Sequence, residues 1–269
     1  MSMLVFKPTT RRIALVTTAT LFFLIFGLPL LLLLLAAFTR QWNGVLPSSL
    51  TLHHARALAA GDQGAALLHS VATGVAASFI ALLFGGGGAL VVRGCPPSLR
   101  RGLDMLYFLP VALPSSTIGL AMLIAFSRKP FLLNGTVLLV ILAHVVLVMA
   151  YAYATISAGL DRLPHSLEEI AGSLGASPPR VLLTITLPLL LPQILAALSL
   201  GFALSMGELG ASIMLYPPQW VTAPVEVFAL TDRGDIYAGA ALGAALLACA
   251  FFVLTLLNRR TSWHGEFQP

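Results

Sequence analysis

Charged residues are scarce in this chain. They make up 9% of its 269 residues, whereas hydrophobic residues make up 58% and the mean hydropathy is +0.93. A soluble globular domain carries roughly 25% charged residues, and a water-soluble fold of this length cannot bury so much apolar surface. The composition therefore predicts an integral membrane protein. Its net charge of +5 is interpreted by the position of the basic residues along the chain, and we expect no nucleic-acid partner.

Residue patterns that indicate catalysis or metal binding are also missing. The two cysteines, Cys95 and Cys249, lie far apart, so no disulfide framework or metal-ligand spacing is visible. The histidines form no His-x-x-x-His pair, and the apolar stretches hold neither an HExxH helix nor paired carboxylates. We therefore expect no catalytic residue and no metal site.

The glycine run Gly85–Gly88 is not a nucleotide-binding loop. No Gly-Lys-Ser/Thr follows it, and it lies inside an apolar stretch. Close helix packing or a kink explains the run better. The chain is thus predicted to bind no ATP, Mg²⁺ or other cofactor itself.

Long apolar stretches are what the sequence has in abundance. A helix needs about 20 apolar residues to cross a bilayer, and backbone groups in lipid must be satisfied within the segment. The first stretch is too long for a signal-peptide core and has no small-residue cleavage site after it, so we interpret it as a spanning helix. The sequence predicts an all-α, polytopic membrane protein with one transmembrane domain over residues 1–269. Its six predicted spans are 13–38, 67–92, 103–127, 131–157, 182–206 and 237–257.

The third and fourth predicted spans are divided by very few residues. Only Ser127-Arg128-Lys129-Pro130 separates them, but a single long helix would have to carry two charges and a proline through the membrane. We therefore keep two spans.

Lysine and arginine predict the orientation of the spans. Cytoplasmic loops carry the excess of these residues. With the N-terminus inside, ten of them are cytoplasmic and five are outside, which favours both termini and the loop 158–181 in the cytoplasm. The inner set is Lys7, Arg11, Arg12, Arg93, Arg100, Arg101, Arg162, Arg180, Arg259 and Arg260, and the outer set is Arg40, Arg56, Arg128, Lys129 and Arg233.

The inner loop contains an unusually polar stretch, SLEEIAGSLGASPPRVLLTITLP, at residues 166–188. Ser166 followed by Glu169 is the pattern of a capping box and predicts a helix start. Gly175 stands where a left-handed C-terminal cap is expected, and Ser177 before Pro178 predicts a second helix start. The first helix has an apolar face that needs a partner to cover it, made of Leu167, Ile170, Ala171 and Leu174.

The same stretch resembles the permease subunits of ABC importers. Their cytoplasmic loop reads EAA, three residues, G, nine residues, I-x-L-P, and this chain keeps every spacing, with Ile170 in place of an alanine. The resemblance implies a type I importer permease fold in a bacterial inner membrane, a second permease subunit, identical or related, and a separate ATPase subunit that binds ATP and Mg²⁺ and receives this loop. An ordinary surface helix is the alternative. The residues implied in ATPase coupling are Glu168, Glu169, Ile170, Ala171, Gly175, Ile185, Leu187 and Pro188.

Three residues are candidates for a gate or for the solute pathway. Pro110 and Pro114 in the third span, like Pro188 and Pro192 in the fifth, remove backbone hydrogen bonds, so either kinked pore helices or plain bends are expected. Glu208 is an acidic residue at the end of the fifth span. A similar Gly-Glu-x-Gly-Ala segment occurs in importers of molybdate and sulfate, so we favour a gate-lining or helix-capping role over recognition of a cation.

The outer segments resemble one branch of these importers. Gln41–Gly44, Met214–Pro218 and Thr231–Gly234 are similar to segments of permeases for 2-aminoethylphosphonate, and sulfate, molybdate and thiamine permeases resemble the chain less. In such importers a periplasmic binding protein docks on the outer loops. The docking candidates are Trp42, Tyr216, Trp220, Asp232 and Arg233, although anchoring at the membrane interface explains the aromatic rings equally well.

The function predicted from these features is that of a permease subunit of an ATP-driven importer of a small polar solute, with 2-aminoethylphosphonate as the expected solute. A sulfate-, molybdate- or thiamine-type permease is one alternative. A stand-alone secondary transporter or channel is another, and it would need intramembrane charges or a filter-like loop.

Overall fold

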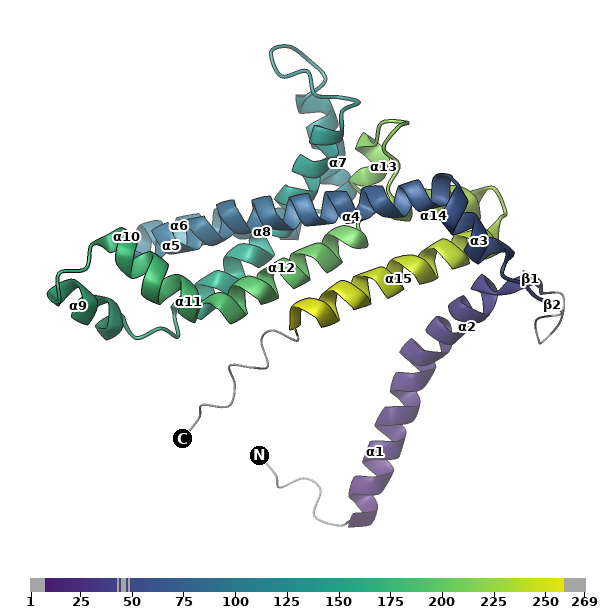
Figure 1. Ribbon diagram of the computed structural model, residues 1–269, viewed down its shortest axis with the longest axis horizontal. Coiled ribbons are helices and arrows are strands. Elements are labelled where there is room, and N and C mark those ends of the chain that lie inside the picture. The colour runs from purple at the N-terminus through teal and green to yellow at the C-terminus, as the bar shows by residue number, and fades with distance from the viewer. Residues whose placement is uncertain (1–7, 43, 45–46, 48, 259–269) are drawn as a thin grey trace. The chain divides into compact units, whose positions relative to one another are not determined.

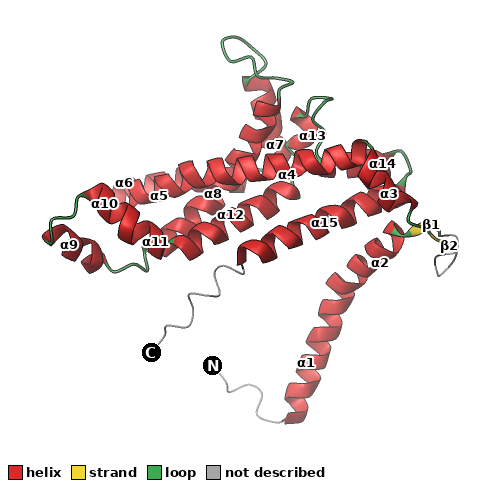
Figure 2. Cartoon of the chain, viewed as in Figure 1, coloured by secondary structure: helices red, strands yellow, loops and turns green. Residues whose placement is uncertain are grey.

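A computed structural model describes residues 8–42, 44, 47 and 49–258 (Figure 1). Lys7, Asn43, Arg259 and Arg260, which entered the predictions above, lie outside the described residues. The described chain is almost entirely helical, apart from one short pair of strands (Figure 2). The prediction of an all-α polytopic membrane protein is confirmed.

Four helices of the described chain are long and apolar enough to cross a membrane. They cover Thr10–Ala37, Asp62–Arg93, Val137–Leu160 and Ile236–Leu257. Two further pairs of bent helices bring the number of candidate spans in the described chain to six if each pair counts as one span. Pro97–Ala112 and Ser115–Ala125 are bent by 102°, and Pro178–Leu189 and Leu191–Met206 are bent by 66°. The predicted third and fifth spans are therefore broken helices.

Prolines explain the break in the third span. Helix α6 (Pro97–Phe108) runs into a 3₁₀ turn, η3 (Leu109–Ala112), that contains Pro110. Leu113 is extended, as expected for a residue before proline, and Pro114 precedes α7 (Ser115–Ala125). The fifth span consists of α10 (Pro178–Val181), a π turn η4 (Leu182–Thr186), α11 (Leu187–Leu189) and α12 (Leu191–Met206), with its break at Leu190.

The fourth span begins later than the sequence predicted. The predicted start at residue 131 is wrong, because helix α8 covers Val137–Leu160. Gly135 has a positive φ of 74°, and the Thr136 side chain accepts a hydrogen bond from the Leu139 amide at 3.4 Å, which places the N-cap at Thr136. The separation between the third and fourth spans is confirmed.

The chain divides into two compact units, of which the first comprises Met1–Gly64 and Val227–Ala245. Its described part starts with α1 (Pro8–Phe22), a π turn η1 (Phe23–Gly27) and α2 (Leu28–Ala37). Strands β1 (Thr39–Gln41) and β2 (Ser49–Leu50) pair antiparallel, and α3 (His53–Ala60) follows. Helices α14 (Ala223–Asp232) and α15 (Ile236–Asn258) each contribute part of their length to this unit.

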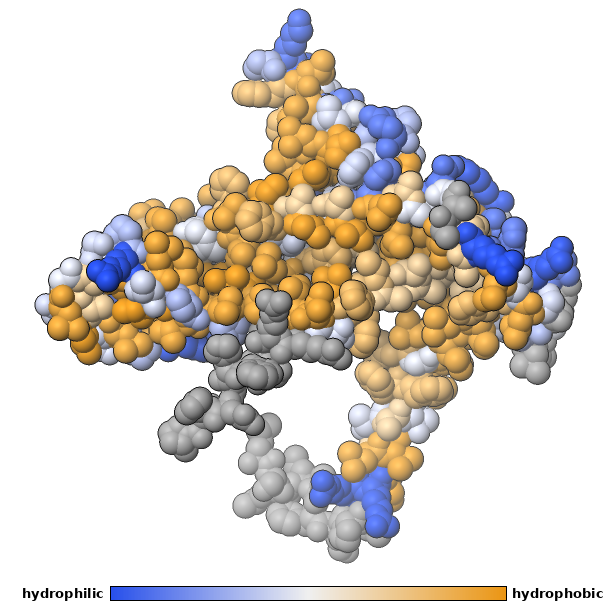
Figure 3. All heavy atoms as spheres, viewed as in Figure 1, coloured by the Kyte–Doolittle hydropathy of each residue, from blue (hydrophilic) through white to orange (hydrophobic). Residues whose placement is uncertain are grey.

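The second unit comprises Ala65–Glu226 and Leu246–Pro269. Its second span is α4 (Asp62–Ala81), a π turn η2 (Leu82–Gly86) and α5 (Gly87–Arg93), and this span packs on α8, which also packs on α12. Small residues allow close approach, as in other membrane helices: a Cβ at Gly85 would lie 2.7 Å from the Met149 carbonyl oxygen. Close helix packing, one of the two explanations predicted for the run, is therefore seen at Gly85, whereas a Cβ at Gly87 would meet nothing within 4 Å. Outward-facing side chains are largely apolar (Figure 3).

Candidate functional site

The polar stretch of the loop 158–181 forms helix α9 (His165–Ser173). The predicted capping box is wrong. Pro164 occupies the N-cap position, with φ −62° and ψ 126°, and Ser166 already lies inside the helix. Proline has no side-chain acceptor, so the start of α9 has no side-chain cap, and Ser166 lies too far into the helix to supply one.

The C-terminus of α9 matches its sequence pattern. Gly175 has a φ of 85°. The Ala176 amide donates to the Ala171 carbonyl at 3.1 Å, and the Gly175 amide donates to the Gly172 carbonyl at 2.9 Å. These two bonds form a Schellman motif, so the predicted left-handed cap is confirmed. Ser177 lies at the N-cap position of α10 as predicted, but its side chain makes no capping hydrogen bond.

One face of α9 is apolar and exposed. Leu167 is 42% exposed, Ile170 57% and Leu174 83%. Ala171, beside them, is half-buried, and Glu169 is exposed. Exposed apolar side chains that follow one face of a polar helix are a feature of interaction surfaces. We call Leu167, Ile170 and Leu174 the α9 stripe.

The other face of α9 is bound to the rest of the second unit. Glu168 Oε1 accepts a hydrogen bond from Arg93 at 2.9 Å and one from the Thr186 hydroxyl at 2.8 Å. A cavity of about 600 Å³ lies here, and its lining includes Arg93, Glu168, Gly172 and Thr186. Thr186 is the second residue of the I-x-L-P pattern. On either side of it, Ile185 and Leu187 are half-buried, and Pro188 is exposed. The I-x-L-P residues therefore lie in the first part of the fifth span, in η4 and α11.

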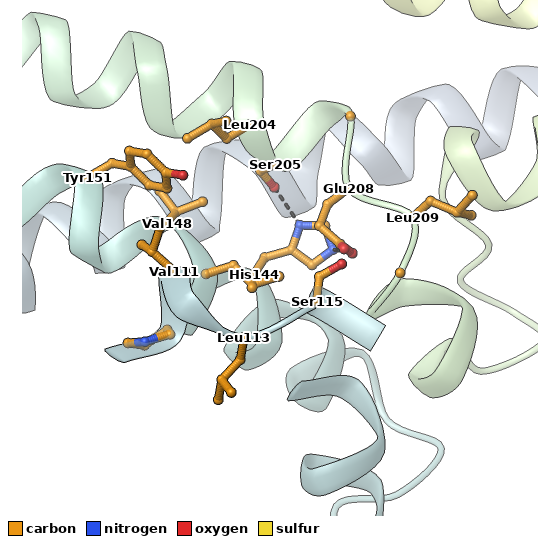
Figure 4. A pocket seen from close by; sticks show the side chains of 14 residues that line it. Val111, Leu113, Ser115, His144, Val148, Tyr151, Leu204, Ser205, Glu208 and Leu209 are labelled. Atoms are coloured by element: carbon orange, nitrogen blue, oxygen red, sulfur yellow. Dashed lines mark hydrogen bonds and ion pairs between the residues drawn. The ribbon is translucent and has the colours of Figure 1, made fainter. Parts of the chain in front are cut away.

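A second cavity, of about 440 Å³, lies between the break of the third span and the C-terminal end of the fifth span, where α12 ends at Met206 (Figure 4). Pro110 and Glu208 both line it, whereas Pro114 does not. Ser115, Tyr151 and Ser205 contribute hydroxyl groups to its wall. The structure thus brings together two of the three predicted pathway residues.

Glu208 caps a helix in this cavity wall. Its carboxylate accepts hydrogen bonds from the Ala211 amide at 3.0 Å and the Ser212 amide at 3.1 Å, at the start of α13 (Ser212–Leu215). These bonds satisfy amides at a helix start and place negative charge where the helix dipole favours it. Two roles were expected for Glu208, helix capping and gate lining. The hydrogen bonds show the capping role, and Glu208 also lines the cavity.

His144 is a buried polar residue that the sequence interpretation passed over. Its side chain is 1% exposed and lies in the middle of α8. Nδ1 is 2.6 Å from the Ser205 hydroxyl, Nε2 is 2.7 Å from the Ser212 hydroxyl, and Glu208 lies 3.9 Å from Nε2. The histidine therefore joins α8, α12 and α13 beside the cavity. Its position inside an apolar span was the signal that could have identified it.

The predicted docking residues lie in both units. Trp42 follows β1 and is half-buried, and Asp232 and Arg233 are exposed at the end of α14. In the second unit, Tyr216 is exposed after α13. Trp220 is held in place by its own chain: its indole N–H donates to Thr73 at 3.0 Å and its ring stacks on His69 with centroids 4.1 Å apart.

The described residues contain no group of three or more histidines, cysteines, aspartates or glutamates that could hold a metal ion.

Comparisons with known proteins give consistent matches. Residues 81–263 match the family model for the inner membrane component of binding-protein-dependent transport systems. PhnV of Salmonella choleraesuis, a permease provisionally named for 2-aminoethylphosphonate transport, is 44% identical over 97% of this chain and 99% of its own length. The molybdenum transport permease ModB of Mycobacterium bovis is 32% identical over 73% of this chain and 79% of its own length.

The fold has a counterpart among solved structures. A chain of the bacterial alginate ABC transporter, determined with a periplasmic protein bound to an alginate pentasaccharide, matches with a TM-score of 0.71. The match covers 94% of each chain at 18% sequence identity, which shows a common fold.

Proposed function

The chain belongs to the family of inner membrane components of binding-protein-dependent transport systems, and from this premise we propose that it passes 2-aminoethylphosphonate through the membrane. It is a non-catalytic, multi-pass permease subunit of an ABC importer in the inner membrane, and nucleotide is bound by the ATPase partner of such systems. The observation that carries the proposed solute is the 44% identity to PhnV over nearly the whole chain. The molybdenum transport permease ModB is less similar and matches a shorter part of the chain.

We also propose the partners of this subunit. The α9 stripe is the surface that fits a groove on an ATP-binding subunit, because a contiguous set of exposed apolar side chains on a polar loop marks an interaction site. Glu169 and Ile170 lie on the sides of α9 that are open to such a partner. A second permease subunit completes the pore, and a periplasmic binding protein delivers the solute to the outer segments that contain Trp42, Tyr216 and Arg233.

The cavity between the two broken spans is the proposed gate region. Broken helices line solute sites in membrane transporters because their unpaired backbone groups face a polar space instead of lipid. Pro110 lies at the break of the third span, and Glu208 lies two residues past the end of α12 in the fifth span. His144 connects the surrounding helices through two serine hydroxyls. No alternative transporter class is needed to explain this arrangement.

Uptake into proteoliposomes tests the proposed solute. Vesicles that contain the complete complex, with its ATP-binding subunit and binding protein, are expected to accumulate radiolabelled 2-aminoethylphosphonate only when ATP is present on the side of the ATPase. Sulfate and molybdate serve as competitors and as alternative labelled solutes. Accumulation of either oxyanion without the phosphonate would overturn the solute while leaving the permease assignment in place.

We further propose that both termini and α9 face the cytoplasm. Lysine and arginine support this orientation, since ten of fifteen lie on the proposed inner side. The test is thiol labelling in a background with Cys95→Ser and Cys249→Ala. Gly172→Cys, at a position with no neighbouring atom within 4 Å of a Cβ, is expected to react only after the membrane is permeabilised. Asp232→Cys is expected to react in intact spheroplasts. The reverse pattern of labelling would contradict the orientation.

A further inference from the structure

We propose that Glu168 is a positioning residue that fastens α9 to the second and fifth spans, so that movement of α9 is transmitted to both. This inference rests on the proposed function of α9 as the contact for the ATPase. It assigns different roles to two adjacent glutamates: Glu169 is open to the partner subunit, whereas Glu168 acts inside the permease.

The contacts of Glu168 connect three parts of the second unit. Arg93 is the last residue of α5 and thus the end of the second span, and its Nη1 donates to Glu168 Oε1 at 2.9 Å. Thr186 is the last residue of the π turn η4 in the fifth span, and its hydroxyl donates to the same oxygen at 2.8 Å. Arg93 also reaches the Leu163 carbonyl, just before α9, at 3.4 Å. We call Arg93, Glu168 and Thr186 the α9 clamp.

The clamp is shielded from water far more than an ordinary surface ion pair. The exposed fraction of the side chain is 11% for Arg93 and 31% for Glu168, and Thr186 is 3% exposed as a residue. Charge-assisted hydrogen bonds in such surroundings are strong, and removal of one partner leaves the other charge buried without compensation. Arg100 and Asp161 form a comparison pair in the same unit, with side chains 35% and 52% exposed, where a contribution close to zero is expected.

The clamp supplies a connection that the chain itself does not. Residues 174–177 link α9 covalently to α10 and so to the fifth span. The second span ends 75 residues before Glu168, so Arg93 joins it to α9 only through side-chain contacts. Thr186 adds a second contact to the fifth span beyond the turn at Gly175. Without Glu168, α9 keeps its stripe for docking but loses its ion pair with the second span.

Separation of ATP hydrolysis from uptake is the expected signature. In proteoliposomes with the complete complex, Glu168→Ala is expected to lower 2-aminoethylphosphonate uptake about tenfold or more, while ATP hydrolysis and co-purification of the ATP-binding subunit stay within about twofold. Asp161→Ala, which removes the exposed comparison pair, is expected to leave all three within about twofold. The double variant Arg93→Glu/Glu168→Arg is expected to recover a large part of the uptake that either single reversal loses, because the Thr186 hydroxyl can accept from a guanidinium.

Other results would overturn the clamp. If Glu168→Ala no longer co-purified with the ATP-binding subunit, Glu168 would be a contact of that subunit. If uptake by Glu168→Ala were unchanged, Glu168 would not be needed to transmit movement from α9 to the spans. If uptake and ATP hydrolysis fell together and the double variant recovered neither, the clamp would only stabilise the fold and would not couple hydrolysis to uptake. The proposal that the ATP-binding subunit docks on α9 fails in a different experiment. If variants with a charged residue in the α9 stripe still co-purify with the ATP-binding subunit, the docking proposal is wrong, whatever the Glu168 variants show.

Discussion

A charge on the α9 stripe is expected to abolish transport by preventing assembly with the ATP-binding subunit. Ile170→Glu/Leu174→Glu places two carboxylates on side chains that are 57% and 83% exposed in this subunit and that we expect to be buried in the complex. Each buried apolar side chain contributes about 1.5–3 kcal/mol, and burial of an unpaired charge adds a further cost. The double variant should therefore weaken assembly by about 3–6 kcal/mol or more, which corresponds to a loss of affinity of roughly 100- to 20,000-fold.

Co-purification of the ATP-binding subunit with the tagged permease measures this effect directly. Leu174→Met is the matched control, because it keeps an apolar side chain of similar volume and is expected to change assembly little. Because the stripe does not contribute to the buried core of the subunit, the permease itself should still insert and remain monodisperse in detergent. A double variant that assembles and transports normally would show that the ATPase binds elsewhere.

Gly85→Ala is expected to destabilise the permease, whereas Gly87→Ala, two residues further along the same span, should be harmless. A Cβ at Gly85 would lie 2.7 Å from the carbonyl oxygen of Met149 and 3.1 Å from the amide nitrogen of Tyr153. Both atoms belong to the backbone of α8, so no side-chain rotation can relieve the clash. Overpacking of this kind costs about 1–3 kcal/mol.

Thermal unfolding in detergent compares the two variants. A Cβ at Gly87 meets nothing within 4 Å, and replacement of a helical glycine by alanine stabilises a helix by about 0.5–1 kcal/mol. The apparent melting temperature should thus fall for Gly85→Ala and stay level or rise for Gly87→Ala. Equal behaviour of the two variants would contradict the close packing of the second span on α8.

Local patterns in the sequence determined much of this protein. Membrane insertion follows from composition, and most spans follow from uninterrupted apolar runs, because backbone satisfaction in lipid requires a helix wherever such a run is long enough. The spacing from Glu169 to Pro188 was sufficient to identify the loop and the permease family. The conformation of Gly175 was also predictable, since the residues that require it lie within one helical turn. Such features depend on neighbours in sequence alone.

Only the tertiary structure decided how distant residues meet. His144 finds its two serine partners 61 and 68 residues away, and Arg93 reaches Glu168 across 75 residues. Prolines marked both broken spans, but whether they bend a helix slightly or turn it by 102° depends on what packs around the break. The capping box failed for a local reason instead: Pro164 occupies the N-cap position, so α9 begins at His165 and Ser166 lies inside it. A residue pattern indicates which local conformations are favourable, and contacts between separate helices determine which of these the chain adopts.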